Sequence, residues 1–425
     1  IAAAERISFP RRETSEYKYT ALFSRLGFNW DRKYFLNLTG RRDGSSRFGP
    51  NNRFANFGAI GAAWIFTEES LIKNHLPFLS FGKLRGSYGT TGNDQIGDYG
   101  YLDAYETTMG PGGLYPTALA NPDYSWEVNK KLEGAIDLGF FEDRLRLGIS
   151  HYQNKSSNQL VGYPLPFTTG FSTVQANLPA TVENSGWEII FSSLNLSNPI
   201  FSWETSFNIT IPKNELISYP DIEQSSYANT YRVGHSLNIA LLYEYTGLDR
   251  DTGLYTIRDV NEDGRFDYND MVIIKNRNRE FYGGFNNNIV YQNFSLQFLW
   301  EFVKQEARIG DFNTSRPGNM HALVLEEEAL QRISQSSQAR TAYTRMINSD
   351  FPYRDASFLR LKTFSLAYDL PTSFKEPLGF EQFRLFIHGQ NLLTMTSYDS
   401  LDPERQNMTG IGNLRAITGG LSVNF

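Results

Sequence analysis

The sequence predicts an all-β, transmembrane antiparallel β-barrel fold from two-residue alternation, the number of alternating segments, and the lengths of their connections. Between residues 201 and 211 every second side chain is apolar except Thr205, and the segment 294–302 repeats this pattern. Because successive strand side chains point to opposite faces, each segment forms one apolar and one polar surface. Many long strands of this kind, rich in aromatic residues, are typical of a barrel wall between lipid and water.

Alternation bounded by turn residues predicts thirteen strands, at residues 17–29, 33–42, 53–66, 81–89, 128–141, 143–154, 183–196, 201–211, 281–291, 294–304, 356–369, 383–394 and 416–425. Tight connections are expected at Trp30–Asp31, Glu142–Asp143, Asn198–Pro199 and Gln292–Asn293. Long connections are expected at about 90–127, 155–182, 212–280, 305–355 and 395–415. Outer-membrane barrels show this asymmetry between their two ends.

The strand directions are consistent only if residues 212–280 form one excursion, although Ile239 to Tyr245 also reads as a strand. If the last strand ends at the periplasm, the first of the thirteen begins outside. Bacterial single-chain barrels have even strand numbers. The sequence therefore predicts the C-terminal part of a larger barrel. Phe425, after Leu421 and Val423 in alternation, is typical of the aromatic end by which assembly machinery recognises barrels.

Composition excludes several other classes of protein. The chain has 425 residues without a Pro- or Ser-rich linker, which favours one large architecture. Its longest apolar run, Ala59–Phe66, is far shorter than the roughly 20 residues of a spanning helix. The absence of cysteine excludes disulfides and thiolate chemistry. The net charge of −6 disfavours nucleic acid as a partner.

The histidines offer no sign of catalysis. They are widely scattered, without metal-ligand spacing or an accompanying nucleophile motif, at His75, His151, His235, His321 and His388. This distribution favours polar strand or loop residues over catalytic bases. We expect no catalytic residues and no enzyme activity.

One segment has the spacing of a calcium-binding loop. Oxygen ligands are expected from Asp259, Asn261, Asp263, Asp267 and Asp270 and from the backbone carbonyl of Arg265, with Gly264 at the sharp turn. The last ligand is Asp rather than the bidentate Glu of an EF-hand. We favour a structural Ca²⁺ in an external loop over the alternative, an acidic turn whose side chains cap local amides.

Aromatic residues fall into two groups. Trp64, Trp203 and Trp300 lie on apolar strand faces, where they are expected to face lipid or form an interfacial girdle. A second group lies in the glycine-containing 90–127 connection, at Tyr99, Tyr101, Tyr105, Tyr115 and Tyr124. Stacking on sugar rings, closing onto a lid and packing among the loops all remain open for these tyrosines.

An ordered series of motifs resembles the SusC/RagA family of TonB-dependent outer-membrane importers of Bacteroidota. The series comprises Arg42–Gly49 (RDGSSRFG), Leu84–Asn93 (LRGSYGTTGN), Asn121–Asp123 with Trp126–Glu127, Glu183–Glu188 (ENSGWE), Asp355–Lys362 (DASFLRLK), Gly389–Thr394 (GQNLLT) and Asp402–Glu404 (DPE). The order of the motifs, rather than any single one, makes the resemblance specific.

The resemblance implies a barrel of about 22 strands closed by an N-terminal plug. Residues 1–425 would then be the C-terminal barrel portion, with the plug and the TonB-contacting segment outside this chain. It further implies active import of oligosaccharides or peptides in the outer membrane, with glycan favoured by its frequency in the family. The implied partners are a SusD-like surface lipoprotein, TonB, the N-terminal fragment of the same transporter, and membrane lipid or lipopolysaccharide, with a dimer of transporter–lipoprotein units as one assembly.

Two other functions are compatible with alternating strands. One is a soluble or surface all-β carbohydrate-binding or hydrolytic protein, in which stacked sheets bury the apolar faces. The other is a passive porin, which the resemblance disfavours because the family carries a plug.

Overall fold

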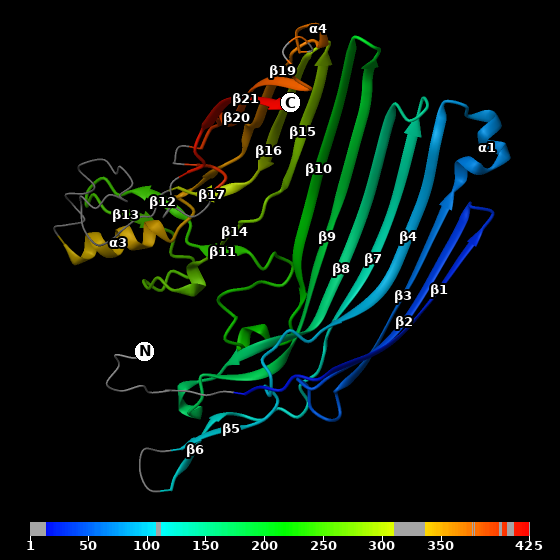
Figure 1. The fold of residues 1–425 in the computed structure, drawn as a ribbon. Coiled ribbons are helices and arrows are strands. Elements are labelled where there is room, and N and C mark those ends of the chain that lie inside the picture. Colours follow the sequence, from blue (N-terminus) through cyan, green and yellow to red (C-terminus); the bar gives the residue numbers. More distant parts are fainter. Residues whose placement is uncertain are drawn as a thin grey trace, which may run out of the picture.

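Thirteen strands form one continuous antiparallel sheet in a computed structural model of the chain (Figure 1). The structure describes residues 14–107, 112–309, 336–375, 377, 379–398, 402–405 and 412–424. Every strand pairs with its neighbours in chain order, apart from short hairpins inserted in the connections. This arrangement confirms the thirteen predicted strands and the antiparallel all-β fold.

The wall strands are β1 (Tyr19–Trp30), β2 (Tyr34–Ser45), β3 (Phe54–Ile65), β4 (Leu79–Asn93), β7 (Glu127–Phe140), β8 (Leu145–Pro164), β9 (Thr173–Ser197), β10 (Phe201–Ser218), β15 (Phe281–Tyr291), β16 (Phe294–Lys304), β19 (Phe358–Asp369), β20 (Gln382–Thr396) and β21 (Ala416–Asn424). Four short two-stranded sheets pair β5 (Ala104–Thr107) with β6 (Leu114–Ala118), β11 (Ile239–Leu242) with β14 (Ile273–Asn276), β12 (Tyr245–Leu248) with β13 (Tyr255–Ile257), and β17 (Glu306–Arg308) with β18 (Tyr353–Asp355). The helices are α1 (Ser70–His75), α3 (Ser337–Ile347) and α4 (Thr372–Lys375). No described helix is long and apolar enough to cross a bilayer.

The strand register separates the two faces of the wall. Residues paired directly across neighbouring strands share a face. We call one face the apolar face because one continuous row on it comprises Trp30, Tyr34, Trp64, Leu84, Ile136, Ile149, Ile189, Ile209, Gly283, Phe302, Leu359 and Met395. The opposite, polar face includes the row Lys83, Asp137, Gly148, Ile190, Asn208, Gly284, Glu301, Arg360 and Thr394.

Thr205, the exception in the alternation, has a partner on the apolar face. Its hydroxyl donates to Oδ1 of Asn287 at 2.8 Å, and the indole N–H of Trp203 donates to the same oxygen at 2.8 Å. Asn287 is 2% exposed. A buried polar group is tolerated when it is hydrogen-bonded, which explains why this strand keeps a hydroxyl among apolar residues.

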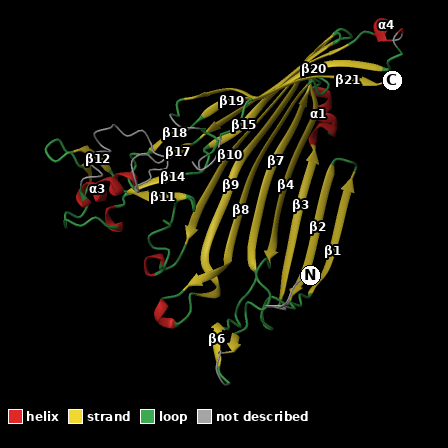
Figure 2. Ribbon diagram, turned by 60° about the vertical axis from the view of Figure 1, so that its left-hand side comes forward, coloured by secondary structure: helices red, strands yellow, loops and turns green. Residues whose placement is uncertain are grey.

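Short turns gather at one end of the wall, which we call the short-turn end. Residues with a left-handed backbone conformation form two of these short turns. The φ angle is 53° at Asp31, 55° at Arg32 and 49° at Gln292. Most of the longer connections, including β11 to β14 and α3, lie at the other end, which we call the loop end (Figures 1 and 2). The stretch from Ile239 belongs to these loop hairpins and does not enter the wall, as predicted.

The predicted long connection at 155–182 is wrong. Strands β8 and β9 continue well beyond their expected ends, and only residues 165–172 separate them. A register shift lies between Ser157 and Gln159, where Asn158 has a φ of 61°. Leu178, beyond this shift, and Val182, just before it, pack in a buried cluster with Leu216 and Tyr219 from the β10 end. This packing stabilises strand in a segment whose Ser, Asn and Pro content favours a loop.

Candidate functional site

A buried ion-pair network lies on the polar face. The Arg360 side chain on β19 is 3% exposed, and its guanidinium donates to Asp402 Oδ1 at 2.7 Å and to Glu404 Oε2 at 2.5 Å. Lys362 Nζ lies 3.0 Å from Glu404 Oε2 and 2.9 Å from Glu301 Oε2. The network therefore attaches the 402–405 segment, which follows β20, to strands β16 and β19.

Asp402 also caps backbone amides of its own connection. Its Oδ1 accepts the amide of Glu404 at 3.0 Å, and its Oδ2 accepts the amide of Asn413 at 2.7 Å. Burial alone would raise the pKa of Asp402, but the Arg360 guanidinium and these amides outweigh it and hold the pKa below its usual value. The carboxylate is therefore charged and fully bonded at neutral pH.

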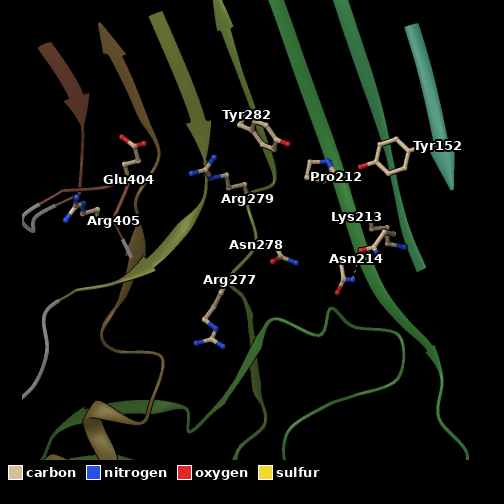
Figure 3. Close-up of a pocket in the computed structure, with 11 residues that line it drawn as sticks. Tyr152, Pro212, Lys213, Asn214, Arg277, Asn278, Arg279, Tyr282, Glu404 and Arg405 are labelled. Carbon is tan, nitrogen blue, oxygen red and sulfur yellow. Dashed lines mark hydrogen bonds between the residues drawn. The ribbon is translucent and has the colours of Figure 1, made fainter. Parts of the chain in front are cut away.

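Next to this network, a pocket of about 910 Å³ opens on the polar face (Figure 3). Its lining comes from β8, β9, β10, β15 with the residues leading into it, and the 402–405 segment. Figure 3 shows Arg405 and Arg279 toward one side, Tyr152 on the other, and Tyr282 between them. These positions lie far apart in the sequence, and the meander of strands brings them together.

Asparagine side chains fix one edge of the pocket. Asn214 accepts from Ser236 Oγ at 3.0 Å and donates to Asn184 Oδ1 at 2.8 Å. Asn278 donates to the same Ser236 oxygen at 2.7 Å. Because Asn278 lies between Arg277 and Arg279 in the chain, this network also holds the backbone that carries both arginines.

The predicted calcium loop lies between β13 and β14, and its carboxylates cap backbone amides. The fully buried Asp270 accepts the amides of Val260 and Asp267, each at 2.9 Å. These amides, with that of Asn261, outweigh burial and hold the pKa of Asp270 below its usual value. Asp259 Oδ2 accepts the amide of Gly264 at 2.9 Å.

Asp263 continues the pattern of caps in this loop. Its Oδ1 accepts the amide of Arg265 at 2.7 Å, and its Oδ2 accepts Nδ2 of Asn261 at 3.0 Å. Asp267 Oδ1 accepts the amide of Asn269 at 2.8 Å. Within the described ranges, no three acidic or histidine side chains are arranged to hold a metal ion. Asp259 Oδ1 is nevertheless buried without a hydrogen-bond partner in the described part of the chain, and the predicted ligands would all be hard oxygens of the kind that Ca²⁺ prefers.

The loop tyrosines divide into buried and exposed residues. Tyr124 is fully buried against Phe48 and Trp126, with Tyr101 packed at the edge of this cluster. Burial raises the pKa of the Tyr124 hydroxyl to about 12. By contrast, Tyr99, Tyr105 and Tyr115 are 45%, 55% and 46% exposed. Loop packing therefore accounts for the buried Tyr124 and the partly buried Tyr101, and ligand stacking stays a prediction for the exposed tyrosines.

The described histidines lie apart from one another in the fold. His75 belongs to α1, His151 to β8 and His388 to β20, and His235 lies between β10 and β11. The ring of His151 contacts Trp187 with centroids 4.7 Å apart. His321 lies outside the described residues, as does Phe425.

An antiparallel wall of thirteen strands, with continuous apolar and polar rows, is the fold of a large outer-membrane barrel. The family model "TonB dependent receptor-like, beta-barrel" matches residues 3–392, and the chain belongs to this family. The family consists of outer-membrane transporters. The resemblance to SusC and RagA is confirmed by the relatives and solved structures that the chain matches.

Two curated relatives place the chain among TonB-dependent receptors. TonB-dependent receptor P3 of Formosa agariphila is 29% identical over 98% of this chain and 46% of the relative. TonB-dependent receptor SusC of Bacteroides thetaiotaomicron is 26% identical over 90% of this chain and 41% of the relative. The chain thus spans less than half the length of these relatives.

Among solved structures, the RagAB peptide transporter shares the fold with a TM-score of 0.80 at 24% identity. The match covers 100% of this chain and 49% of that chain.

Sequence reasoning missed the arginines of the pocket. Arg277 and Arg279 lie inside the long 212–280 connection, and Arg405 lies in another connection. The alternation of Arg277 and Arg279 around Asn278 was the available signal in the sequence. It does not show which distant segment of the chain lies opposite these two arginines. The register of β15 against β10 and β16 places Tyr282 in the pocket, and the arginines line it from connections outside these strands.

Proposed function

We propose that the chain is the barrel portion of a SusC-like outer-membrane importer of oligosaccharide or peptide nutrients. This proposal rests on one observation: apolar and polar side chains lie on opposite faces across the whole wall. The apolar row would contact lipid, and the polar row with its ion pairs would line an aqueous lumen. A barrel of about 22 strands would enclose a channel too wide to stay open. This chain covers 46% of the length of TonB-dependent receptor P3, and the rest of that length would include the plug that closes the channel.

The proposed mechanism is transport without covalent chemistry. A SusD-like lipoprotein would capture the ligand at the loop end and close over the barrel. TonB would supply inner-membrane energy to move a plug contributed by the N-terminal fragment. The similarity to TonB-dependent receptors supports coupling to TonB, and the similarity in fold to the RagAB peptide transporter supports peptide as one substrate class.

Uptake measurements in the source bacterium test this function. A strain lacking the gene should lose growth on one class of oligosaccharide or peptide, and a wild-type copy should restore it. Dissipating the proton-motive force or removing TonB should abolish uptake through the restored protein. Uptake that persists without TonB would contradict active import. Large steady conductance of the whole complex in planar bilayers would instead indicate a passive porin.

We further propose that the loop of Asp259–Asp270 binds a structural Ca²⁺. The hard-oxygen ligand set supports this proposal, and so does Asp259 Oδ1, which is buried without a hydrogen-bond partner among the residues that the structure describes. The ion would brace the connection between β10 and β15 in place of some amide caps. Chelation should increase proteolysis of this connection, and added Ca²⁺ should reverse the effect. Unchanged cleavage would indicate that the caps alone maintain the loop.

A further inference from the structure

The pocket beside the Arg360 network carries positive charge that the described residues do not compensate. Arg277, Arg279 and Arg405 form no ion pair within the described ranges. Glu404 also lines the pocket, but its carboxylate is engaged by Arg360 and Lys362. The three arginines therefore line a polar cavity, and no carboxylate among the described residues forms an ion pair with them.

The backbone that carries Arg277 and Arg279 is held in place by the fold. The amide of Arg277 donates to the carbonyl of Asn238 at 2.9 Å, and the Asn278 side chain is held by Ser236. The Arg279 guanidinium lies 5.5 Å from the centroid of the Tyr282 ring. A guanidinium held in this way loses less conformational entropy when it binds a carboxylate or sulfate through paired hydrogen bonds.

The remaining lining suits a sugar chain. Tyr152 and Tyr282 offer aromatic rings, and the Asn184 and Asn214 amides can bond hydroxyl groups. Lys213 also borders the pocket but is already paired with Glu215, so its charge is compensated. A neutral or cationic oligomer would leave the three arginines without a counter-charge, which favours an anionic ligand.

We propose that this pocket binds an anionic oligosaccharide, with Arg277, Arg279 and Arg405 contacting its carboxylate or sulfate groups. The inference rests on the proposed import function and specifies its substrate class. Arg279 and Arg405 bind the anionic groups, while the tyrosine rings contact the adjacent sugar faces.

Calorimetric binding to the complete transporter in detergent tests this inference. The probes are oligogalacturonate, chondroitin sulfate oligosaccharide, maltooligosaccharide and a glutamate-rich peptide, all of matched length. Wild-type protein should bind at least one anionic sugar more tightly than the neutral sugar, and more weakly as ionic strength rises. The triple variant R277Q/R279Q/R405Q should weaken that binding at least about tenfold.

Controls separate this result from a folding defect. The variant R258Q should bind like wild type, because Arg258 lies outside the pocket lining and pairs with Glu244 at 3.0 Å. The variant R277K/R279K/R405K should retain part of the affinity. Heat-modifiable migration should show that every variant is assembled. Equal affinity for neutral and anionic sugars, no effect of the triple variant, or arginine-dependent binding of the peptide alone would overturn the inference. TonB-dependent uptake without anion preference would overturn it while leaving the importer function intact.

Discussion

Arg360 is a buried cation whose partners come from a different part of the chain. It neutralises Asp402 and Glu404, and its Nε donates to Thr394 at 3.0 Å. Removing one member of a buried ion pair leaves the other charges desolvated without compensation. The resemblance motifs that contain Arg360 and Asp402 thus meet in one structural contact.

The variant R360Q should lose about 3–5 kcal/mol of unfolding free energy, because the buried Asp402 loses its cation and the partly buried Glu404 loses one of its two. Denaturant titration of the assembled protein measures this loss. R384Q is the matched control, because Arg384 lies 4.0 Å from Asp369 and its side chain is 39% exposed. The control should change stability by less than about 1 kcal/mol. Equal losses in both variants would contradict a special role for Arg360.

The depressed pKa of Asp402 predicts how the 402–405 segment responds to acid. A carboxylate with a folded pKa below its unfolded value stabilises the fold above the unfolded pKa of 3.8. That contribution disappears as pH falls through the lower folded value. We expect pulsed hydrogen exchange at a series of pH values to show that the amides of this segment are protected at pH 3.8 and above. Below pH 3.8 their exchange should increase. The variant D402N should not show this increase in exchange. An unchanged increase in the variant would contradict its assignment to Asp402.

At the scale of elements, glycine permits the close approach of β15 to its neighbours. A Cβ on Gly283 would lie 2.0 Å from the Asn208 carbonyl oxygen and 2.6 Å from Phe302 Cζ. Gly134 on β7 has nothing within 4 Å of the same position. The two glycines therefore serve different purposes, although both lie inside wall strands.

G283A should destabilise the wall by about 1–3 kcal/mol, because the Asn208 backbone must move to make room. G134A is the matched control and should be neutral or slightly stabilising, since an added Cβ meets open space. Denaturant titration compares the two variants. A G283A protein as stable as G134A would show that β10 and β15 can separate without cost.

The alternation of apolar and polar residues located the strands well, because each wall strand exposes one face to an apolar environment and the opposite face to a polar environment. It failed at the ends of β8 and β9, where Leu178 and Val182 pack on the β10 end instead of following the wall pattern. It also ended β4 too early, at residue 89, because glycines at 89 and 92 carry no polarity signal. The pocket arginines could not be placed, since they come from connections whose course depends on tertiary packing.

At the scale of the whole molecule, the apolar row continues across strands that are far apart in the sequence. It joins Trp30 on β1 to Met395 on β20 through direct pairs. In a soluble sandwich, this surface would need a second protein layer. In an outer-membrane barrel, hydrocarbon supplies the apolar environment, and aromatic residues such as Trp64 gather near the short-turn end.

A pair of neighbouring substitutions tests this assignment of the faces. Ile149 lies on the apolar row, and Ser150, the next residue, lies on the opposite face, where it pairs with Glu188. I149R should cost about 2–4 kcal/mol near the bilayer midplane, whereas S150R should place its charge in water. We therefore expect outer-membrane fractions and heat-modifiable migration to show loss of assembled I149R and near-normal S150R. Normal assembly of both variants, or recovery of detergent-free soluble protein, would mean that hydrocarbon does not cover the apolar face.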